Sequence, residues 1–175
     1  MWDERRRVDG TAFWPRYVRR VTRIPRTVLP DGSFHVYSKG VDGCAIFRDD
    51  RDHLVFLDLL RACGRRFRWR FYALCLMTTH YHLVVDATRQ HLSDGHHLLN
   101  GIYAQRFNRR YDRKGHLFGY RFGSRVIEDE RYLHDACLYV VNNPVRAGLC
   151  DTWEEWRWAH LSADLSAESE HLFPS

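Results

Sequence analysis

The chain has 175 residues, of which 45% are hydrophobic and 14% aromatic, a composition that excludes a disordered protein and predicts one folded domain with extensions. Its formal net charge is +5, and all but two of its 27 basic residues are arginines, the exceptions being Lys39 and Lys114. Arginine presents a rigid fork that matches phosphate oxygens and stacks on bases, so the composition favours nucleic acid as a partner over a merely basic, solvated surface.

The five cysteines are scattered and include no C-x-x-C pair, which indicates small buried side chains in a reducing compartment. The N-terminus has no apolar signal core, and no run approaches the roughly 18 apolar residues of a membrane helix. We therefore expect a cytoplasmic, nucleoid-associated protein with no membrane partner.

Residues 1–30 are rich in arginine and interrupted by prolines, so we expect a basic arm with little regular structure. This arm lies either along a nucleic-acid backbone or packed on the domain, and the sequence favours neither. An Asp31-Gly32 turn signal then precedes an alternating strand over residues 33–38. Asp49 or Asp50 caps the following helix, whose apolar positions continue to a stop signal at about Gly64.

The next two predicted strands form a hairpin around Thr78-Thr79. The first, over residues 67–77, alternates so that Phe67, Trp69, Phe71 and Ala73 share one face and Arg68 and Arg70 the other.

The second strand of the hairpin, residues 80–86, carries His80 and His82 on one face, because side chains two apart on a strand point the same way. Tyr81, Leu83 and Val85 then face the core. Two histidines on a strand are most often a half-solvated surface pair. Paired imidazoles at this spacing can also act as two ligands of a divalent metal ion.

After a polar link over residues 87–97, apolar side chains recur every four residues and predict a helix with the stripe Leu99, Tyr103, Phe107 and Tyr111. Several arginines lie on this helix. They form either an ordinary solvated face or a face that binds phosphate groups. A turn and a fourth strand follow within residues 115–127. The next helix runs from Glu130 to about Asn142 and stops before Pro144. One more short helix starts at Trp153, ahead of an acidic end.

The order β-α-β-β-α-β with an added helix predicts an α+β, ferredoxin-like (split βαβ) antiparallel sheet. Two helices cover one face and leave the other open, with the two histidines on the open face. We divide the chain into the arm (1–30), the folded domain (31–150) and a C-terminal helix and acidic tail (151–175).

On the added helix, Tyr139 and Asn143 are neighbours one turn apart, beside the apolar stripe. A tyrosine in this position is usually a packing residue. The alternative is a nucleophile. A phenol has a pKa near 10 and attacks poorly unless a base or a metal assists it.

Four segments together resemble the REP-associated tyrosine transposases, which are one-tyrosine members of the HUH (His-hydrophobe-His) nucleases. They are residues 80–82 (His-Tyr-His), residues 107–110 (Phe-Asn-Arg-Arg), residues 115–118 (Gly-His-Leu-Phe) and residues 139–149 (Tyr-Val-Val-Asn-Asn-Pro-Val-Arg-Ala-Gly-Leu). The resemblance runs from about Phe34 to Leu149 and includes the fold. It implies binding of hairpin-forming, REP-like single-stranded DNA, as a monomer or a homodimer.

The resemblance further implies that Tyr139 cuts DNA through a 5′-phosphotyrosine intermediate, from which strands can be rejoined. It makes His80, His82 and Asn143 the ligands of Mg²⁺ or Mn²⁺, with His35 as an alternative third ligand and Tyr132 as an alternative nucleophile. Two residues depart from the family pattern. Thr78-Thr79 stands where relatives have Pro-Asn, and Val41 where they have Asn.

The basic side chains expected to contact DNA are Lys39, Arg68, Arg70, Arg106, Arg109, Arg110, Arg113, Lys114, Arg121 and Arg125. Two other functions stay open. One is a catalytically silent, domesticated single-stranded nucleic-acid-binding protein, and the other is a metal hydrolase that acts through activated water.

Overall fold

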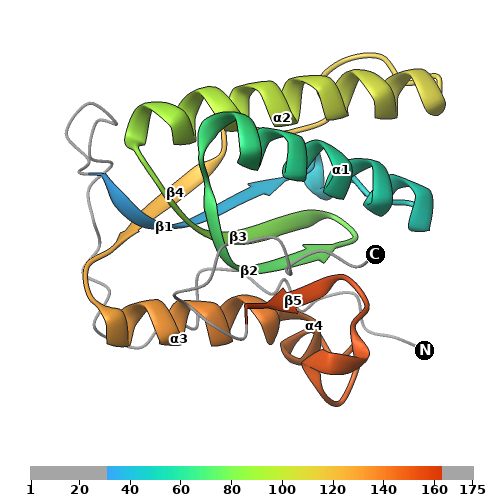
Figure 1. Cartoon of the computed structure of the whole chain (residues 1–175). Coiled ribbons are helices and arrows are strands. Elements are labelled where there is room, and N and C mark those ends of the chain that lie inside the picture. Colours follow the sequence, from blue (N-terminus) through green and yellow to red (C-terminus); the bar gives the residue numbers. More distant parts are fainter. Residues whose placement is uncertain (1–30, 163–175) are drawn as a thin grey trace.

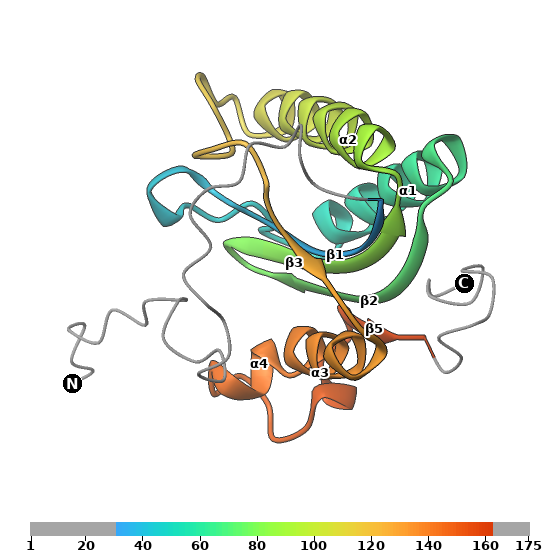
Figure 2. The ribbon, with the colours of Figure 1, turned by 90° about the vertical axis from the view of Figure 1, so that its left-hand side faces the viewer.

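The computed structural model describes residues 31–162, which form a five-stranded antiparallel sheet with helices on both faces (Figures 1 and 2). The sheet order is β4-β1-β3-β2-β5, from strands β1 (Gly32–Lys39), β2 (Arg70–Met77), β3 (His80–Ala87), β4 (Gly123–Ile127) and β5 (Ala159–Leu161). The helices are α1 (Asp50–Phe67), α2 (Arg89–Arg110), α3 (Glu130–Val141) and α4 (Asn143–Arg146). The first four strands and α1 to α3 confirm the predicted α+β order, while the basic arm and most of the acidic tail lie outside the described residues.

Helices α1 and α2 pack side by side on one face of the sheet (Figure 2). From β3, this face receives Tyr81, Leu83 and Val85, which are all fully buried, as the alternation predicted. Asp49 caps α1 by accepting a hydrogen bond from the Asp52 backbone N–H. The helix continues past Gly64 to Phe67 and ends where Arg68 takes a left-handed conformation (φ 52°), so β2 starts at Arg70 instead of residue 67.

The predicted alternation along β2 is wrong because the strand contains a bulge between Phe71 and Ala73. A bulge adds one residue to one strand and so reverses the faces that follow it. Phe71 packs under α1 and α2, whereas Ala73 and Cys75 pack on the opposite face.

The predicted polar link over residues 87–97 is also wrong, because α2 already begins at Arg89, with the Thr88 hydroxyl accepting from the His91 N–H. After Leu92, its first turns bury a glycine and a histidine, Gly95 and His96, before the apolar stripe begins at Leu99. A Cβ at Gly95 would lie 2.3 Å from the Trp69 ring, and the His96 ring stacks between Trp69 and Phe122, 4.5 Å from each. These contacts are with distant segments, so local periodicity could not reveal them.

The sequence analysis predicted that the second face of the sheet is open, and this is wrong. Helices α3 and α4 cover it (Figure 2). Ala136, Cys137 and Val140 of α3 pack there against β2 and β3. Pro144 ends α3 as predicted, yet it stands in the first turn of α4, where a missing N–H costs nothing.

The segment from Trp153 is not the predicted helix. It makes a single 3₁₀ turn at Trp153–Glu155 and then strand β5, which pairs with the edge of β2. The Trp156 indole N–H donates to the Leu76 carbonyl over 3.0 Å, which fixes this last strand. In the described part of the chain, none of the helices has the length and apolar character needed to span a lipid bilayer.

Candidate functional site

Strands β1 and β3 bring three histidines together on the sheet face that carries α3. The two strands pair in antiparallel register, with Tyr37 opposite His82 and Lys39 opposite His80. His35 lies two residues before Tyr37 on the same face. Its Nε2 is 3.0 Å from Nδ1 of His82, and the two rings stack with 5.2 Å between centroids.

Helix α3 places Tyr139 beside this cluster in the same chain. The apolar stripe of α3 faces the sheet, and Tyr139 lies on its flank, where it stays partly exposed. Its ring centroid is 6.2 Å from that of His82 and 5.8 Å from that of His35, with both contacts edge-on. The alternative nucleophile, Tyr132, lies seven residues earlier, about 10 Å along the helix axis.

Both predicted ligand histidines have their Nδ1 engaged by a neighbour. His80 Nδ1 is 3.0 Å from the Thr79 hydroxyl, and His82 Nδ1 bonds to His35. When each Nδ1 carries the proton, Nε2 of both rings presents a lone pair, which is how metal-binding histidines are usually held. In this arrangement of protons, His35 would orient the His82 ring.

The protonation state of the pair also suits a metal. Burial, and secondarily the Lys39 charge, lowers the pKa of His80 to about 4. Burial lowers the pKa of His82 well below its usual value, with further effects of the neighbouring histidines and Arg146. Both rings are therefore neutral at pH 7, the form that coordinates metal ions.

Asn143 begins α4 one turn after Tyr139. Its amide NH₂ donates to the carbonyls of Tyr139 and Val140, over 2.9 and 3.0 Å, which leaves the amide oxygen as the acceptor. Within residues 31–162, no three His, Cys, Asp or Glu side chains gather around a common metal position. The donors that the pair offers are therefore two neutral imidazoles, and the amide oxygen of Asn143 stays a prediction as the third ligand. This set suits a divalent cation that keeps water or phosphate oxygen in its shell.

The sequence analysis did not identify Arg146 as a residue of the site. It extends from α4 so that its guanidinium carbon lies 4.7 Å from the centroid of the Tyr139 ring. The residue belongs to the 139–149 segment that carries the family resemblance, and this was the only sequence signal that pointed to it.

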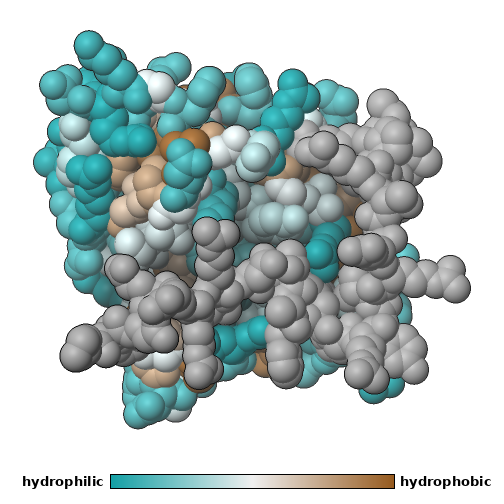
Figure 3. Space-filling view, turned by 180° about the vertical axis from the view of Figure 1, so that it is seen from behind, coloured by the Kyte–Doolittle hydropathy of each residue, from teal (hydrophilic) through white to brown (hydrophobic). Residues whose placement is uncertain are grey.

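Apart from Arg110, the predicted DNA-binding residues divide into three groups. Lys39 and Arg125 flank the histidines, because they pair in register with His80 and His35. Arg70 and Arg113 are half-buried, with the Arg113 guanidinium donating to Asn108. The exposed group is Arg68, Arg106, Arg109, Lys114 and Arg121. Hydrophilic side chains gather on the rear face over the end of α2 and the loop that follows it (Figure 3).

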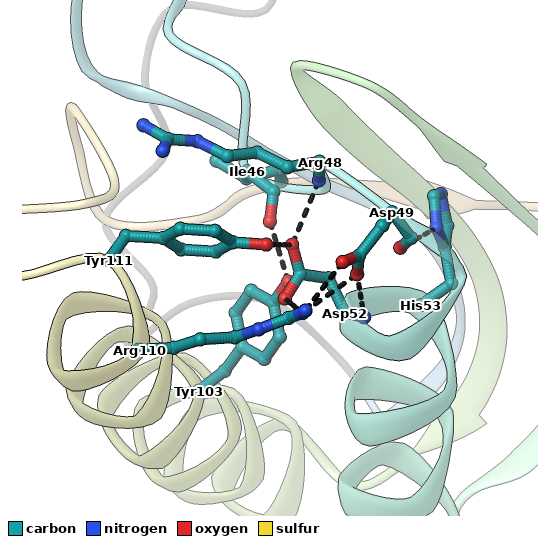
Figure 4. Close-up of polar contacts among 8 residues, drawn as sticks. All are labelled: Ile46, Arg48, Asp49, Asp52, His53, Tyr103, Arg110 and Tyr111. Atoms are coloured by element: carbon teal, nitrogen blue, oxygen red, sulfur yellow. Dashed lines mark hydrogen bonds and ion pairs between the residues drawn. The ribbon is translucent and has the colours of Figure 1, made fainter.

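Arg110 is committed to contacts within the chain (Figure 4). Its fork donates to both carboxylate oxygens of Asp49, and its Nη1 is 2.6 Å from buried Asp52. Tyr111 donates to the second Asp52 oxygen over 2.8 Å. These bonds tie the end of α2 to the start of α1, which is a structural task for an arginine predicted to bind DNA.

Three comparisons relate the chain to known proteins. The family model described as "Transposase IS200 like" matches residues 44–143. The structure of a REP-associated tyrosine transposase bound to a REP hairpin has a similar fold, with a TM-score of 0.59 and 15% identity over 83% of this chain and 84% of that one. A candidate transposase from Deinococcus radiodurans R1 is 20% identical over 69% of this chain and 97% of its own, with a TM-score of 0.46. None of the curated proteins matches this chain.

Proposed function

Because the chain belongs to the family of IS200-like transposases, we propose that it is a single-stranded DNA endonuclease and strand transferase that uses Tyr139 as its nucleophile. One observation carries this proposal: the ring of Tyr139 lies within 6.2 Å of His82 in the same chain. The contact places the phenol ring beside two neutral imidazoles that could hold a metal ion.

The proposed reaction exchanges one phosphodiester for another. The Tyr139 oxygen attacks the scissile phosphorus while the bond to the 3′ oxygen breaks. The phenol proton passes to solvent, and the released 3′ oxygen takes up a proton from water. The product is a 5′-phosphotyrosine on the downstream strand and a free 3′-hydroxyl upstream. Because the bond broken and the bond formed are of the same type, the 3′-hydroxyl of another strand can reverse the step and join to the held end.

His80 and His82 would hold Mg²⁺ or Mn²⁺ through Nε2, with Asn143 as the third protein ligand. The cation would polarise the phosphoryl group and offset negative charge in the transition state. The protein itself keeps both imidazoles neutral and oriented, through His35 and Thr79. It also holds the Tyr139 ring beside His82.

The fold and the charge support one substrate class in this proposal. The similar solved transposase is bound to a REP hairpin. In our proposal the present chain also takes single-stranded DNA that forms a hairpin, and exposed arginines at the end of α2 neutralise its backbone. The tyrosine and the histidines meet within one chain, so in this proposal a monomer would be sufficient for one site and a homodimer would hold two.

The test uses a pool of single-stranded oligonucleotides with one fixed hairpin, randomised flanks and a 3′ fluorescent label. The full chain is incubated with the pool with Mg²⁺, with Mn²⁺ or with EDTA, and run on a denaturing protein gel. We expect a labelled covalent adduct with either metal, none with EDTA and none from Tyr139→Phe, which should still bind the hairpin.

The same gel separates the other two functions. A silent binding protein would retain the hairpin on a native gel without cutting it. A hydrolase that uses activated water would shorten the DNA without leaving protein on it. An adduct that persists in Tyr139→Phe would reject this tyrosine as the nucleophile.

A further inference from the structure

Arg146 is the charged side chain that contacts the proposed nucleophile most directly. Its guanidinium carbon lies 4.7 Å from the centroid of the Tyr139 ring. At this distance a guanidinium over an aromatic face is attracted by the ring electrons. The arginine itself is exposed, so its fork is also accessible to a ligand that approaches the phenol.

The backbone fixes the position from which Arg146 reaches the site. Its N–H donates to the Asn142 carbonyl over 3.0 Å, and the Leu149 N–H donates back to Pro144. Gly148 closes the turn with a left-handed φ of 68°. Helix α4 is therefore a compact cap whose one arginine is directed towards α3.

The ring on which Arg146 stacks lies in turn beside the proposed metal-binding pair. The centroids of the Tyr139 and His82 rings are 6.2 Å apart. The guanidinium is therefore on the phenol that faces this pair. A phosphate placed between Tyr139 and His82 would lie beside this charge.

Another arginine shows what a purely structural contact of this kind looks like. Arg157 also lies 4.7 Å from a ring centroid, that of Trp158, and is exposed. Its guanidinium is 2.7 Å from Asp50, so it joins the β5 segment to α1. Arg157 therefore matches Arg146 in geometry and exposure but stacks on a tryptophan in place of the proposed nucleophile.

We propose that Arg146 is a catalytic residue that binds a non-bridging oxygen of the scissile phosphate and then of the phosphotyrosine; this role depends on the function proposed above. Arginine donates through a planar fork that fits two phosphate oxygens. In the free protein it stacks on the Tyr139 ring. A rotation of its terminal side-chain bonds would bring the fork to a phosphate at the phenol oxygen.

The experiment compares a charged with an uncharged phosphate. Covalent capture from the randomised pool first identifies the cleaved sequence. That oligonucleotide is then made with either a phosphodiester or a methylphosphonate at the scissile position, since methylphosphonate lacks the negative oxygen. Adduct formation is timed at enzyme excess for the wild type, Arg146→Gln, Arg146→Lys and the matched control Arg157→Gln.

On the phosphodiester, we expect Arg146→Gln to form the adduct about 100-fold more slowly, as when one preorganised donor to a developing charge is removed. The rate of Arg146→Lys should lie between those of the wild type and Arg146→Gln, and Arg157→Gln should form the adduct as fast as the wild type. On the methylphosphonate, the ratio of the wild-type rate of adduct formation to the Arg146→Gln rate should shrink towards one. The reason is that no negative oxygen is left for the arginine to bind. A ratio that stays unchanged, or an Arg146→Gln variant as fast as the wild type, would overturn the proposal.

A binding measurement keeps this result separate from the proposed chemistry. In the Tyr139→Phe background nothing is cut, so the affinities of both oligonucleotides can be compared with and without Arg146→Gln. We expect weaker binding of the phosphodiester only. If the wild type forms no adduct although this difference is present, the proposed nucleophilic function fails while the phosphate contact stands. Equal losses on both oligonucleotides would reject the phosphate contact.

Discussion

The ring of Tyr139 on α3 lies edge-on to the ring of His82 on β3, with 6.2 Å between their centroids and an interplanar angle of 88°. The two residues are 57 positions apart and come from adjacent layers of the molecule, the sheet and the helix that covers its second face. Their meeting depends on α3 packing over the second face of the sheet through Ala136, Cys137 and Val140. The features around this contact lead to predictions that separate site residues from structural ones.

His35 should matter for metal affinity although we do not expect it to bind metal. Its Nε2 is 3.0 Å from His82 Nδ1, so it can accept the proton that this nitrogen carries when Nε2 of His82 binds a metal. Loss of such an outer partner typically costs about 10- to 100-fold in metal affinity. We expect His35→Phe to weaken Mn²⁺ binding by this amount in calorimetry, with His35→Gln less affected. Equal Mn²⁺ affinity in His35→Phe and the wild type would contradict this role.

The stability of the fold should fall as the pH drops below about 6.5, the usual pKa of histidine. His53 lies in the core with its ring stacked between Phe47 and Trp158, and burial lowers its pKa in the folded protein. The unfolded chain then binds more protons below pH 6.5, so the free energy of unfolding decreases with acidification. The contribution is complete above pH 6.5 and is lost progressively below it.

The measurement is the melting temperature of the wild type and His53→Phe between pH 7.5 and 5. Phenylalanine keeps the stacked ring and cannot take up a proton, so the variant should lose less stability than the wild type over this range. Other buried histidines, such as His35 with a pKa of about 3, will keep part of the slope. Identical slopes for the two proteins would show that His53 does not contribute to the pH dependence.

Arg110 should stabilise the fold, whereas its neighbour Arg109 should contribute to DNA binding. Removing the Arg110 fork leaves the buried Asp52 carboxylate without its cation. We expect Arg110→Gln to lower the free energy of unfolding in urea. Arg109→Gln, on the exposed side of the same turn, should leave the unfolding curve unchanged.

Hairpin binding as a function of salt completes this comparison. If Arg109 contacts phosphate, its loss weakens binding and reduces the slope of log affinity against log salt by about 1. A folded Arg110→Gln protein should keep the wild-type slope. The reverse pattern, with Arg110 affecting the salt slope and not the stability, would assign Arg110 to the DNA-binding surface.

Two glycines of α2 should respond in opposite directions to the same substitution. Gly95→Ala would place a methyl group 2.3 Å from the Trp69 ring, so the core must shift and stability should fall by about 1–3 kcal/mol. Gly101 has nothing within 4 Å of an added Cβ, and alanine there should raise stability by up to about 1 kcal/mol through helix propensity. Urea unfolding measures both changes in stability. A Gly95→Ala protein as stable as the wild type would show that the Trp69 ring does not lie against Gly95.

The sequence predicted those features that depend on local pattern. The alternation in β3 assigned Tyr81 and Leu83 to the core and His82 to the other face, and the cap at Asp49 gave the start of α1. Features fixed by contacts between distant segments were not predictable. The bulge after Phe71, the burial of Gly95 and His96, and the pairing of β5 with β2 all belong to this kind.

The candidate site shows the same division. The spacing of His80 and His82 and the family resemblance of the 139–149 segment pointed to the residues, but neither implied the hydrogen bond from His82 to His35 or the stacking of Arg146 on Tyr139. Those contacts arise only when β1, β3, α3 and α4 are assembled. Arg110 is the opposite case, because its basic character suggested DNA while the fold supplies it with two carboxylates.

The most direct measurement of the central claim is the identity of the residue that becomes attached to DNA. The adduct formed with Mn²⁺ is digested with nuclease and trypsin, and the modified peptide is sequenced by tandem mass spectrometry. Tyr132 and Tyr139 fall in the same tryptic peptide, so the fragment ions must distinguish them, while Tyr37, whose ring is 6.0 Å from His82, lies in another. We predict a nucleotide phosphate on Tyr139 alone. A phosphate on Tyr37 or Tyr132, with Tyr139 unmodified, would contradict the account.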